Sequence, residues 1–329
     1  MLKKIPFIKN DQVQQVLNSK IDNFRKAELI SAICRINTLS IIKKAGSGHI
    51  GTSFSAIDLF IWIKLFLFKN KRNFINNLNR NIFFSSKGHD APALYCVLYA
   101  LGLINIKKIL KLRRLGGLEG HPDISINGIE ANTGSLGMGI SKAKGFLWAK
   151  KYQKKKGNVV VMIGDGEFQE GQIFEALQTV THQNLNDLIV IMDHNKIQSS
   201  QFVKKIIDLG DLNKKIKSFG WHVERCNGHD FKEINNVFKK FKKIKNRPKF
   251  LIADTIKGKG VNFMEHSQVM KKQKFYNWHA GAPNDNDFNS AQKILLQELE
   301  KLSQISKIKK FKFSDITLKQ DIKKNFEIH

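Results

Sequence analysis

Residues 159–199, VVVMIGDGEFQEGQIFEALQTVTHQNLNDLIVIMDHNKIQS, decide the fold of this 329-residue chain. Apolar runs over 159–163 and 188–192 predict two buried strands, and the segment between them predicts a helix. A strand, a helix and a second strand in this order are typical of a βαβ crossover, in which the two strands run parallel. We therefore expect an α/β fold with a doubly wound, mainly parallel sheet flanked by helices.

Polar residues follow both predicted strands. Gly164, Asp165 and Gly166 follow the first, and Asn195 follows the second. Ligands bind beyond the carboxyl ends of parallel strands, so Asp165 and Asn195 should face one crevice. A carboxylate, an amide oxygen and nearby backbone carbonyls form a hard oxygen set that favours Mg²⁺ or Ca²⁺. Gly166 would let the backbone approach a diphosphate closely, although Gly-Asp-Gly alone is also common in plain tight turns.

Four histidines lie in loops, three of them rich in glycine. Such loops can bring an imidazole close to a ligand, and imidazole exchanges protons near neutral pH. A single loop of this kind is commonly structural, but its repetition indicates a shared site. The four are His49 in AGSGHIG (45–51), His89 in SSKGHD (85–90), His121 in GGLEGHP (116–122) and His279 in WHAGAP (278–283).

Two further turns are ambiguous. The segment ANTGSLGMGI (131–140) leads into a small-residue helix over 141–149, which suits close packing on a planar or anionic cofactor but also a plain packed helix start. The segment KGKG (257–260) follows a predicted strand and is either a phosphate loop or an exposed basic turn. The other elements we expect are helices within 11–44, a buried helix over 56–68, strands over 82–84, 219–227 and 249–255, and a helix over 287–302.

The composition indicates a globular protein. Hydrophobic residues make up 42% of the chain, and its three cysteines are too few and too scattered for a disulfide framework or a zinc site. We therefore expect a reducing, cytoplasmic environment. The N-terminus has no apolar core typical of a secretory signal, and the apolar stretch over 56–68 is too short to span a bilayer.

The formal net charge of +28 raises the possibility of a nucleic-acid or membrane partner. The excess consists mostly of lysines spread over several segments, without a recognisable nucleic-acid-binding motif. We interpret the charge as a solvated surface that also attracts anionic substrates, and we expect neither a nucleic acid nor a membrane as partner.

The central crossover is similar to the thiamin diphosphate motif of transketolases. The resemblance rests on Gly-Asp-Gly at 164–166, on Glu-Gly and Glu-Ala at 170–171 and 175–176, and on Asn-Lys-Ile at 195–197. The four histidine loops stand in the same order as in that family, so the resemblance extends over about residues 30–300. It implies that Asp165, the Asn195 side chain and the Ile197 carbonyl bind magnesium, with Ca²⁺ as a substitute, while Gly166 and Asn195 contact the diphosphate.

The resemblance also implies roles for the loops. His49, His121 and His279 correspond to imidazoles around the donor sugar and the reactive thiazolium, and Glu170 to an acidic residue of the cofactor-coupling interface. Cofactor contacts are implied for His89, Gly134, Ser135, Leu136, Gly166, Asn195 and His279. Two departures stand out: Ser135 replaces a proline found in many relatives, and residues 266–277 form a longer connector than we expect.

Transketolases also have a second domain, which binds the aminopyrimidine ring, and a third; this chain resembles the first alone. We expect residues 1–300 to form the diphosphate-binding domain with its N-terminal helices, and 301–329 a basic tail. The resemblance implies the N-terminal subunit of a split transketolase acting on sugar phosphates. Its partner would be a separate C-terminal subunit with the pyrimidine domain, in a heterotetramer or around a homodimer core.

Three alternatives remain open. The chain could belong to a 1-deoxyxylulose-5-phosphate synthase-like enzyme or one for an unusual sugar, although Glu170 and Trp278-His279 favour a transketolase. A non-catalytic paralogue that only binds cofactor or a partner would show no transfer activity with any pyrimidine-domain partner. A nucleic-acid-binding protein would show salt-sensitive retention on DNA.

Overall fold

A five-stranded parallel sheet lies at the centre of the computed structural model, which describes residues 4–68, 78–308 and 311–317. The strand order is β2-β3-β4-β8-β7, so the crossover between β3 and β4 joins neighbouring strands. The five predicted strands are confirmed, with ends that differ by a few residues. They are β2 (Ile82–Ser85), β3 (Val159–Gly164), β4 (Leu188–His194), β7 (His222–Asn227) and β8 (Lys249–Asp254).

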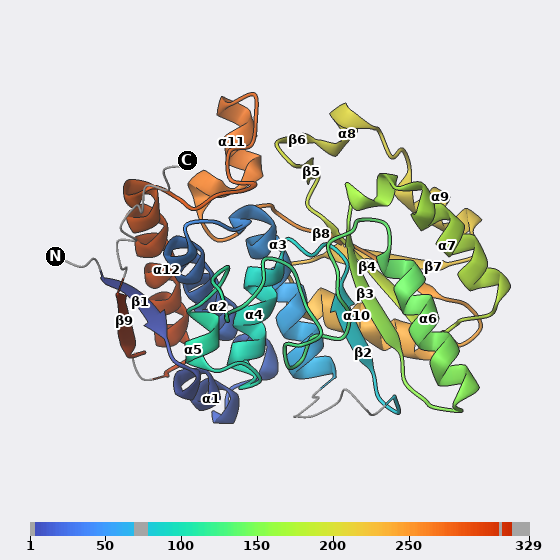
Figure 1. Cartoon of the computed structure of the whole chain (residues 1–329), viewed down its shortest axis with the longest axis horizontal. Coiled ribbons are helices and arrows are strands. Elements are labelled where there is room, and N and C mark those ends of the chain that lie inside the picture. The colour runs from blue at the N-terminus through green and yellow to red at the C-terminus, as the bar shows by residue number, and fades with distance from the viewer. Residues whose placement is uncertain (1–3, 69–77, 309–310, 318–329) are drawn as a thin grey trace, which may run out of the picture.

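Helices cover both faces of the sheet, which explains why its central strands are continuous apolar runs (Figure 1). Along β3, Val160 and Met162 point into one core while Val159 and Val161 point into the other. The first core contains α2 (Asn23–Ala45), α3 (Ile50–Ile61), α4 (Ala91–Ala100), α10 (Phe231–Lys243) and α12 (Asp285–Ile305). The second contains α6 (Gly139–Tyr152), α7 (Gly171–His182) and α9 (Leu212–Ser218).

Helix α2 leads into the loop that places His49 at the edge of the sheet. The Asp22 side chain caps its N-terminus by accepting hydrogen bonds from the N–H groups of Phe24 and Arg25. Gly46 ends the helix with a left-handed backbone (φ 74°), a conformation that glycine adopts without steric cost. His49 follows three residues later and immediately precedes α3.

The apolar segment that contains 56–68 is a buried helix, as predicted, but the apolar helical stretch begins earlier and is longer than expected from the sequence. Helix α3 continues into a π-helical turn, η1 (Trp62–Leu67). Residues 50–67 are apolar enough and long enough for a membrane span, but 83% of this window is buried inside the protein. The core packing of a folded domain therefore accounts for its composition.

The two ends of the described chain form a small sheet that the sequence did not indicate. Strand β1 (Lys4–Ile8) pairs antiparallel with β9 (Phe313–Thr317). The boundary expected at residue 300 falls inside α12, which ends at Ile305, and β9 lies within the expected basic tail. Residues 318–329 of that tail lie outside the described residues.

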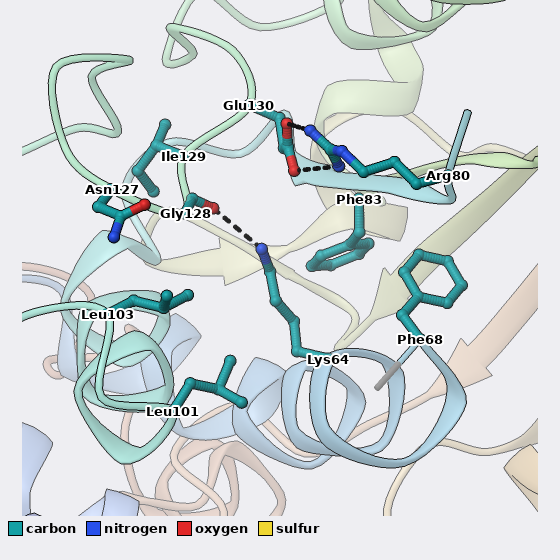
Figure 2. A pocket seen from close by; sticks show the side chains of 10 residues that line it. All are labelled: Lys64, Phe68, Arg80, Phe83, Leu101, Leu103, Asn127, Gly128, Ile129 and Glu130. Atoms are coloured by element: carbon teal, nitrogen blue, oxygen red, sulfur yellow. Dashed lines mark hydrogen bonds and ion pairs between the residues drawn. The ribbon is translucent and has the colours of Figure 1, made fainter. Parts of the chain in front are cut away.

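A long connection between α4 and α6 carries His121 and the turn at 131–140, and residues of η1 and of the segment just before β2 anchor it. Figure 2 shows the small cavity, about 30 Å³, at this anchor. Arg80 donates two hydrogen bonds to the Glu130 carboxylate, 2.7 and 2.6 Å long, and Lys64 on η1 donates to the Gly128 carbonyl at 3.0 Å. Paired contacts of this kind fix the connection more firmly than a single bond.

The remaining elements are short, apart from α1, and several surround the carboxyl edge of the sheet. They are α1 (Asn10–Asn18), α5 (Ile106–Ile109), η2 (Glu167–Gln169), β5 (Ile197–Gln198), β6 (Gln201–Phe202), α8 (Val203–Ile206), η3 (Asn262–Met264) and α11 (His266–Lys272).

Candidate functional site

A cavity of about 270 Å³ lies beyond the carboxyl ends of β2, β3, β4 and β8. Asp165 and Asn195 both line it, as the crossover predicts. The predicted residues that line it are His49, His89, His121, Gly134, Leu136, Asp165, Gly166, Asn195, Ile197 and His279. Segments from distant parts of the chain therefore meet in one place.

Two predicted residues do not line this cavity. Ser135 is exposed, although its neighbours Gly134 and Leu136 are part of the wall. Glu170 is exposed at the N-terminus of α7, where its side chain lies against Gly137. Both residues are accessible from outside the chain, so their assigned roles stay predictions.

Oxygen atoms with free lone pairs gather at the ends of β3 and β4. Asp165 is 3% exposed, and its carboxylate accepts hydrogen bonds from Gly166 N (2.8 Å) and Lys196 N (2.5 Å). The Asn195 amide oxygen accepts one from Ile197 N at 3.2 Å. Burial raises the pKa of Asp165, so its charged form gains from a nearby cation.

This oxygen set differs from a cluster of ionisable ligands. Across the described ranges, no group of three or more His, Cys, Asp or Glu side chains is arranged to hold a metal. The expected ligands are one carboxylate, one amide and one backbone carbonyl, a mixed set of hard oxygens that fits Mg²⁺ or Ca²⁺ better than Zn²⁺.

Three of the predicted imidazoles face one another. The ring centroids of His49 and His279 are 5.2 Å apart, those of His49 and His89 5.4 Å, and those of His89 and His279 5.8 Å. Burial, followed by the positive charge of Arg113, lowers the pKa of His49 to about 4. Burial and Lys257 lower the pKa of His279 to about 3, and burial and Lys87 lower that of His89 well below its usual value. The three rings are therefore neutral at pH 7 and can accept or donate a proton.

Lowered histidine pKa values predict a loss of stability in acid. Between about pH 4 and 6.5 the unfolded chain binds protons that folded His49 and His279 do not, so the free energy of unfolding should fall as the pH falls. After discounting for partial exposure, we expect about 1 kcal/mol per histidine between pH 7 and 5. Urea unfolding at both pH values measures this loss, and a His49→Gln, His279→Gln double variant should lose about 2 kcal/mol less than the wild type. An equal loss in both proteins would contradict the assignment.

Lys257 brings a positive charge to the cavity, so the KGKG turn is not exposed at this residue, while its role as a phosphate loop stays a prediction. Its side chain is buried, and Nζ donates hydrogen bonds to the carbonyl oxygens of Ile197 (3.0 Å) and Ser199 (3.2 Å). It also lies 3.3 Å from His279 Nδ1. Burial lowers the pKa of Lys257 to about 7, and Asp165 opposes this effect. An anion in the cavity would favour the charged form of Lys257.

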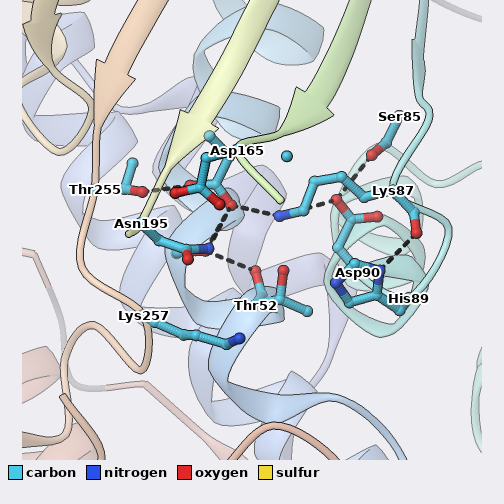
Figure 3. A network of polar contacts seen from close by, with 12 residues as sticks. Thr52, Ser85, Lys87, His89, Asp90, Asp165, Asn195, Thr255 and Lys257 are labelled. Atoms are coloured by element: carbon cyan, nitrogen blue, oxygen red, sulfur yellow. Dashed lines mark hydrogen bonds and ion pairs between the residues drawn. The ribbon is translucent and has the colours of Figure 1, made fainter. Parts of the chain in front are cut away.

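A buried network of charged and polar side chains contacts the amide nitrogen of Asn195 (Figure 3). Lys87 donates a hydrogen bond to the Asp193 carboxylate, which also accepts hydrogen bonds from Ser55 and Thr255. The Asn195 amide nitrogen lies 3.3 Å from Asp193 Oδ2 and 3.3 Å from Ser55 Oγ. Because this nitrogen donates toward the network, the amide oxygen is oriented away from it.

Several buried polar atoms in the wall have no partner within the described chain. They are His49 Nδ1, Thr52 Oγ1 and Gln198 Oε1. Buried polar groups are normally hydrogen-bonded, so this wall has the form of a binding surface for a polar ligand. A Cβ at Gly134 would lie 2.9 Å from the His121 ring, and a Cβ at Gly88 would lie 2.5 Å from Gly134 Cα, so glycine is required at both. The residues present fit a diphosphate with a bound divalent cation.

Sequence analysis missed several lining residues, among them Lys87, Glu167 and Thr52. Glu167 directly follows Gly-Asp-Gly; it accepts hydrogen bonds from Ser86 Oγ and from the N–H groups of Gly137 and Gly164. Burial raises its pKa to about 7. The sequence did offer a signal for two of them, because Glu167 stands next to the Gly-Asp-Gly motif and Lys87 stands within SSKGHD.

Comparison with known proteins agrees with this geometry. Residues 26–295 match the family described as transketolase, thiamine diphosphate binding domain. The chain is 33% identical over 276 residues to one of the subunits of apulose-4-phosphate transketolase from Phocaeicola vulgatus, covering 84% of this chain and 95% of that relative. It is 36% identical over 235 residues to 6-deoxy-6-sulfo-D-fructose transketolase subunit SqwG of Clostridium sp. (strain MSTE9), covering 71% and 86%.

A solved structure, transketolase from Campylobacter jejuni, superposes with a TM-score of 0.72 at 25% identity. The match covers 87% of this chain and 47% of that one, so this chain corresponds to about half of the Campylobacter enzyme. The fold, the matched residues and the two subunit relatives all agree. The chain belongs to the transketolase family, and residues 26–295 are its thiamine diphosphate-binding domain.

Proposed function

We propose that the chain is the N-terminal subunit of a split thiamin diphosphate-dependent transketolase, with an activity of the type EC 2.2.1.1. The observation that carries this proposal is the cavity in which neutral imidazoles, the Asp165 carboxylate and the Lys257 amine converge. It is supported by two relatives that are named as transketolase subunits and whose length this chain largely spans.

Within this cavity, each part of the cofactor would have its own residues. Asp165, Asn195 and the Ile197 carbonyl would hold Mg²⁺, or Ca²⁺ as a substitute, because they form the hard oxygen set. Lys257 and His89 would hold the diphosphate next to Gly166. When bound, thiamin diphosphate supplies the nucleophilic carbon for transfer of a two-carbon ketol unit.

The chain itself would position the sugar and move its protons. His49, His121 and His279 line the cavity, and their pKa values are all lowered by burial. A neutral imidazole can accept a proton from a sugar hydroxyl with one nitrogen and donate with the other, which general acid–base catalysis of ketol transfer requires. The buried wall would also exclude water from the reacting carbon.

The partner in this proposal is a C-terminal subunit that carries the pyrimidine-binding domain. Leu136 is 41% exposed and Glu170 is exposed close to it, both beside the cavity, so they are available for contact with that subunit. A heterotetramer of two copies of each chain would complete two sites. A cytoplasmic location and a role in the pentose phosphate pathway are part of the same proposal.

A coupled assay tests the proposal. Xylulose 5-phosphate, ribose 5-phosphate, thiamin diphosphate and Mg²⁺ are supplied to this chain alone and to its mixture with a pyrimidine-domain subunit. We expect ketol transfer in the mixture and none in either chain alone. No transfer, from a complex shown to form and to bind the cofactor, would reject this donor and acceptor pair.

Other sugars are the second candidate, because the two subunit relatives are named for apulose 4-phosphate and 6-deoxy-6-sulfo-D-fructose. The same complex is therefore assayed with these two ketoses as donors. Pyruvate with glyceraldehyde 3-phosphate is the further arm, and turnover there would assign a 1-deoxyxylulose-5-phosphate synthase-like activity. If the assembled complex is inactive in every arm, the proposed transferase function is wrong.

Replacing His279 with alanine should impair both cofactor binding and turnover. His279 contacts Lys257 and faces His49, so its loss removes a neutral proton carrier and a neighbour of the diphosphate-binding lysine. We expect kcat to fall about 100-fold, as is usual for loss of a general acid–base group, and the cofactor affinity to fall about tenfold. Steady-state kinetics at saturating cofactor separate these effects. His182→Ala, an exposed histidine on α7, is the control and should leave both unchanged.

A further inference from the structure

The connector over 266–277 forms a small structure of its own beside the cavity. It begins with α11 and continues to Tyr276. Val269 and Tyr276 share a separate apolar cluster with Ile197, whose carbonyl faces Lys257, and Phe202 and Trp278 pack against it. This connector is therefore attached to the β5–β6 hairpin, and Figure 1 shows both beyond the carboxyl edge of the sheet.

Tyr276 is held on several sides within this connector. Its side chain is 2% exposed, its hydroxyl donates a hydrogen bond to the Met264 carbonyl at 2.9 Å, and its N–H donates to the Ser200 carbonyl at 2.8 Å. The hydroxyl also lies close to two glycines: a Cβ would be 2.5 Å from it at Gly51 and 2.8 Å at Gly258. Four segments of the chain thus fix the position of the ring.

The ring of Tyr276 faces the Lys257 ammonium, with Nζ 5.3 Å from the ring centroid. Among the described residues, no carboxylate lies within ion-pair distance of Lys257, whose hydrogen-bond partners are two carbonyl oxygens and His279. Lys87, in contrast, is paired with Asp193. An aromatic face attracts a cation without neutralising it, so Lys257 keeps its charge available for an anion.

We propose that Tyr276 is a positioning residue that holds Lys257 in place for the diphosphate of the cofactor. The inference rests on the proposed cofactor site and adds a residue of the 266–277 connector to it. The aromatic face fixes the ammonium next to the Ile197 carbonyl, and the hydroxyl fixes the ring. Loss of the ring removes one of the contacts that hold the Lys257 ammonium, beside its two carbonyl partners and His279, and so weakens binding through lost preorganisation.

A double-mutant cycle on the full chain tests this role, with magnesium pyrophosphate as the probe and titration calorimetry as the measurement. We expect Tyr276→Leu to weaken binding about tenfold, the size of a buried cation–π contact, and Tyr276→Phe, which keeps the ring, to weaken it less than threefold. Lys257→Met should weaken binding strongly. In the Lys257→Met background, Tyr276→Leu should have no further effect, because a positioning residue acts only through its partner.

Each outcome decides between the alternatives. Equal affinity of the Tyr276→Leu variant and the wild type, or a full tenfold loss on the Lys257→Met background, overturns the inference and leaves the cofactor site intact. A Tyr276→Phe variant as weak as Tyr276→Leu assigns the effect to the hydroxyl and also overturns it. If the wild type binds no magnesium pyrophosphate, the proposed cofactor site is wrong, and the proposed function is rejected together with the role of Tyr276. Circular dichroism checks folding, and Tyr276→Met replaces the leucine variant if that variant does not fold.

Discussion

Replacing Asp165 with alanine is expected to abolish magnesium-dependent binding of thiamin diphosphate by the assembled enzyme. Asp165 is the only buried carboxylate in the expected metal-ligand set of the described residues, and the other two members are uncharged oxygens. Without it the divalent cation keeps only an amide and a carbonyl, which bind Mg²⁺ weakly. We expect the affinity for Mg²⁺ to fall at least about 100-fold, because removal of outer partners of a metal site alone costs 10–100-fold.

Titration of cofactor-free enzyme with Mg²⁺ at fixed thiamin diphosphate, followed by tryptophan fluorescence, measures this loss independently of turnover. The control is Asp187→Ala, which removes an exposed carboxylate just before the amino end of β4 and should not change the affinity. The Asp165→Ala variant should fold, because burial raises the pKa of Asp165 and the free enzyme therefore gains little from its charge. Wild-type affinity in Asp165→Ala would show that the metal is bound elsewhere.

The main features of this site could be predicted because they depend on strand ends. The apolar runs before Asp165 and Asn195 identify two parallel strands, and parallel strands end at the same edge of a sheet. The loops that carry the histidines then place His49, His89 and His279 at that edge. For these residues, local sequence patterns and the topology rule are sufficient.

Other features depend on contacts that local patterns do not encode. Strands β1 and β9 pair across nearly the whole chain, and neither is long enough to show a clear alternation. Lys257 follows a strand in a basic turn, yet it is buried and contacts residues distant in sequence, among them Ile197 and Tyr276. The pairing of Lys87 with Asp193 joins residues 106 positions apart. Only the folded chain shows which lysines are surface charges and which are buried.

Replacing Lys87 with methionine is expected to destabilise the folded chain by about 3–5 kcal/mol, the usual cost of breaking a buried ion pair. Burial alone opposes charge on both partners, yet their attraction raises the pKa of Lys87 and lowers that of Asp193. Methionine has a similar length but leaves Asp193, which has no exposed surface, without a counter-charge. The pair contributes fully between about pH 4 and 10.5, above the unfolded pKa of aspartate and below that of lysine, so unfolding is measured at pH 7.

The control is Lys64→Met, because Lys64 is a half-buried lysine that donates its hydrogen bond to a carbonyl, that of Gly128. It should cost only about 1 kcal/mol, the value of an ordinary hydrogen bond. The double variant Lys87→Met, Asp193→Asn removes both charges of this pair and should recover most of the lost stability, although it leaves Asp90, which also pairs with Lys87 and whose pKa burial raises. Its Mg²⁺ affinity should nevertheless stay about 10–100-fold below the wild type, because Asp193 no longer orients the Asn195 amide. Recovery of both stability and affinity would mean that the network supports the fold without positioning the metal ligand.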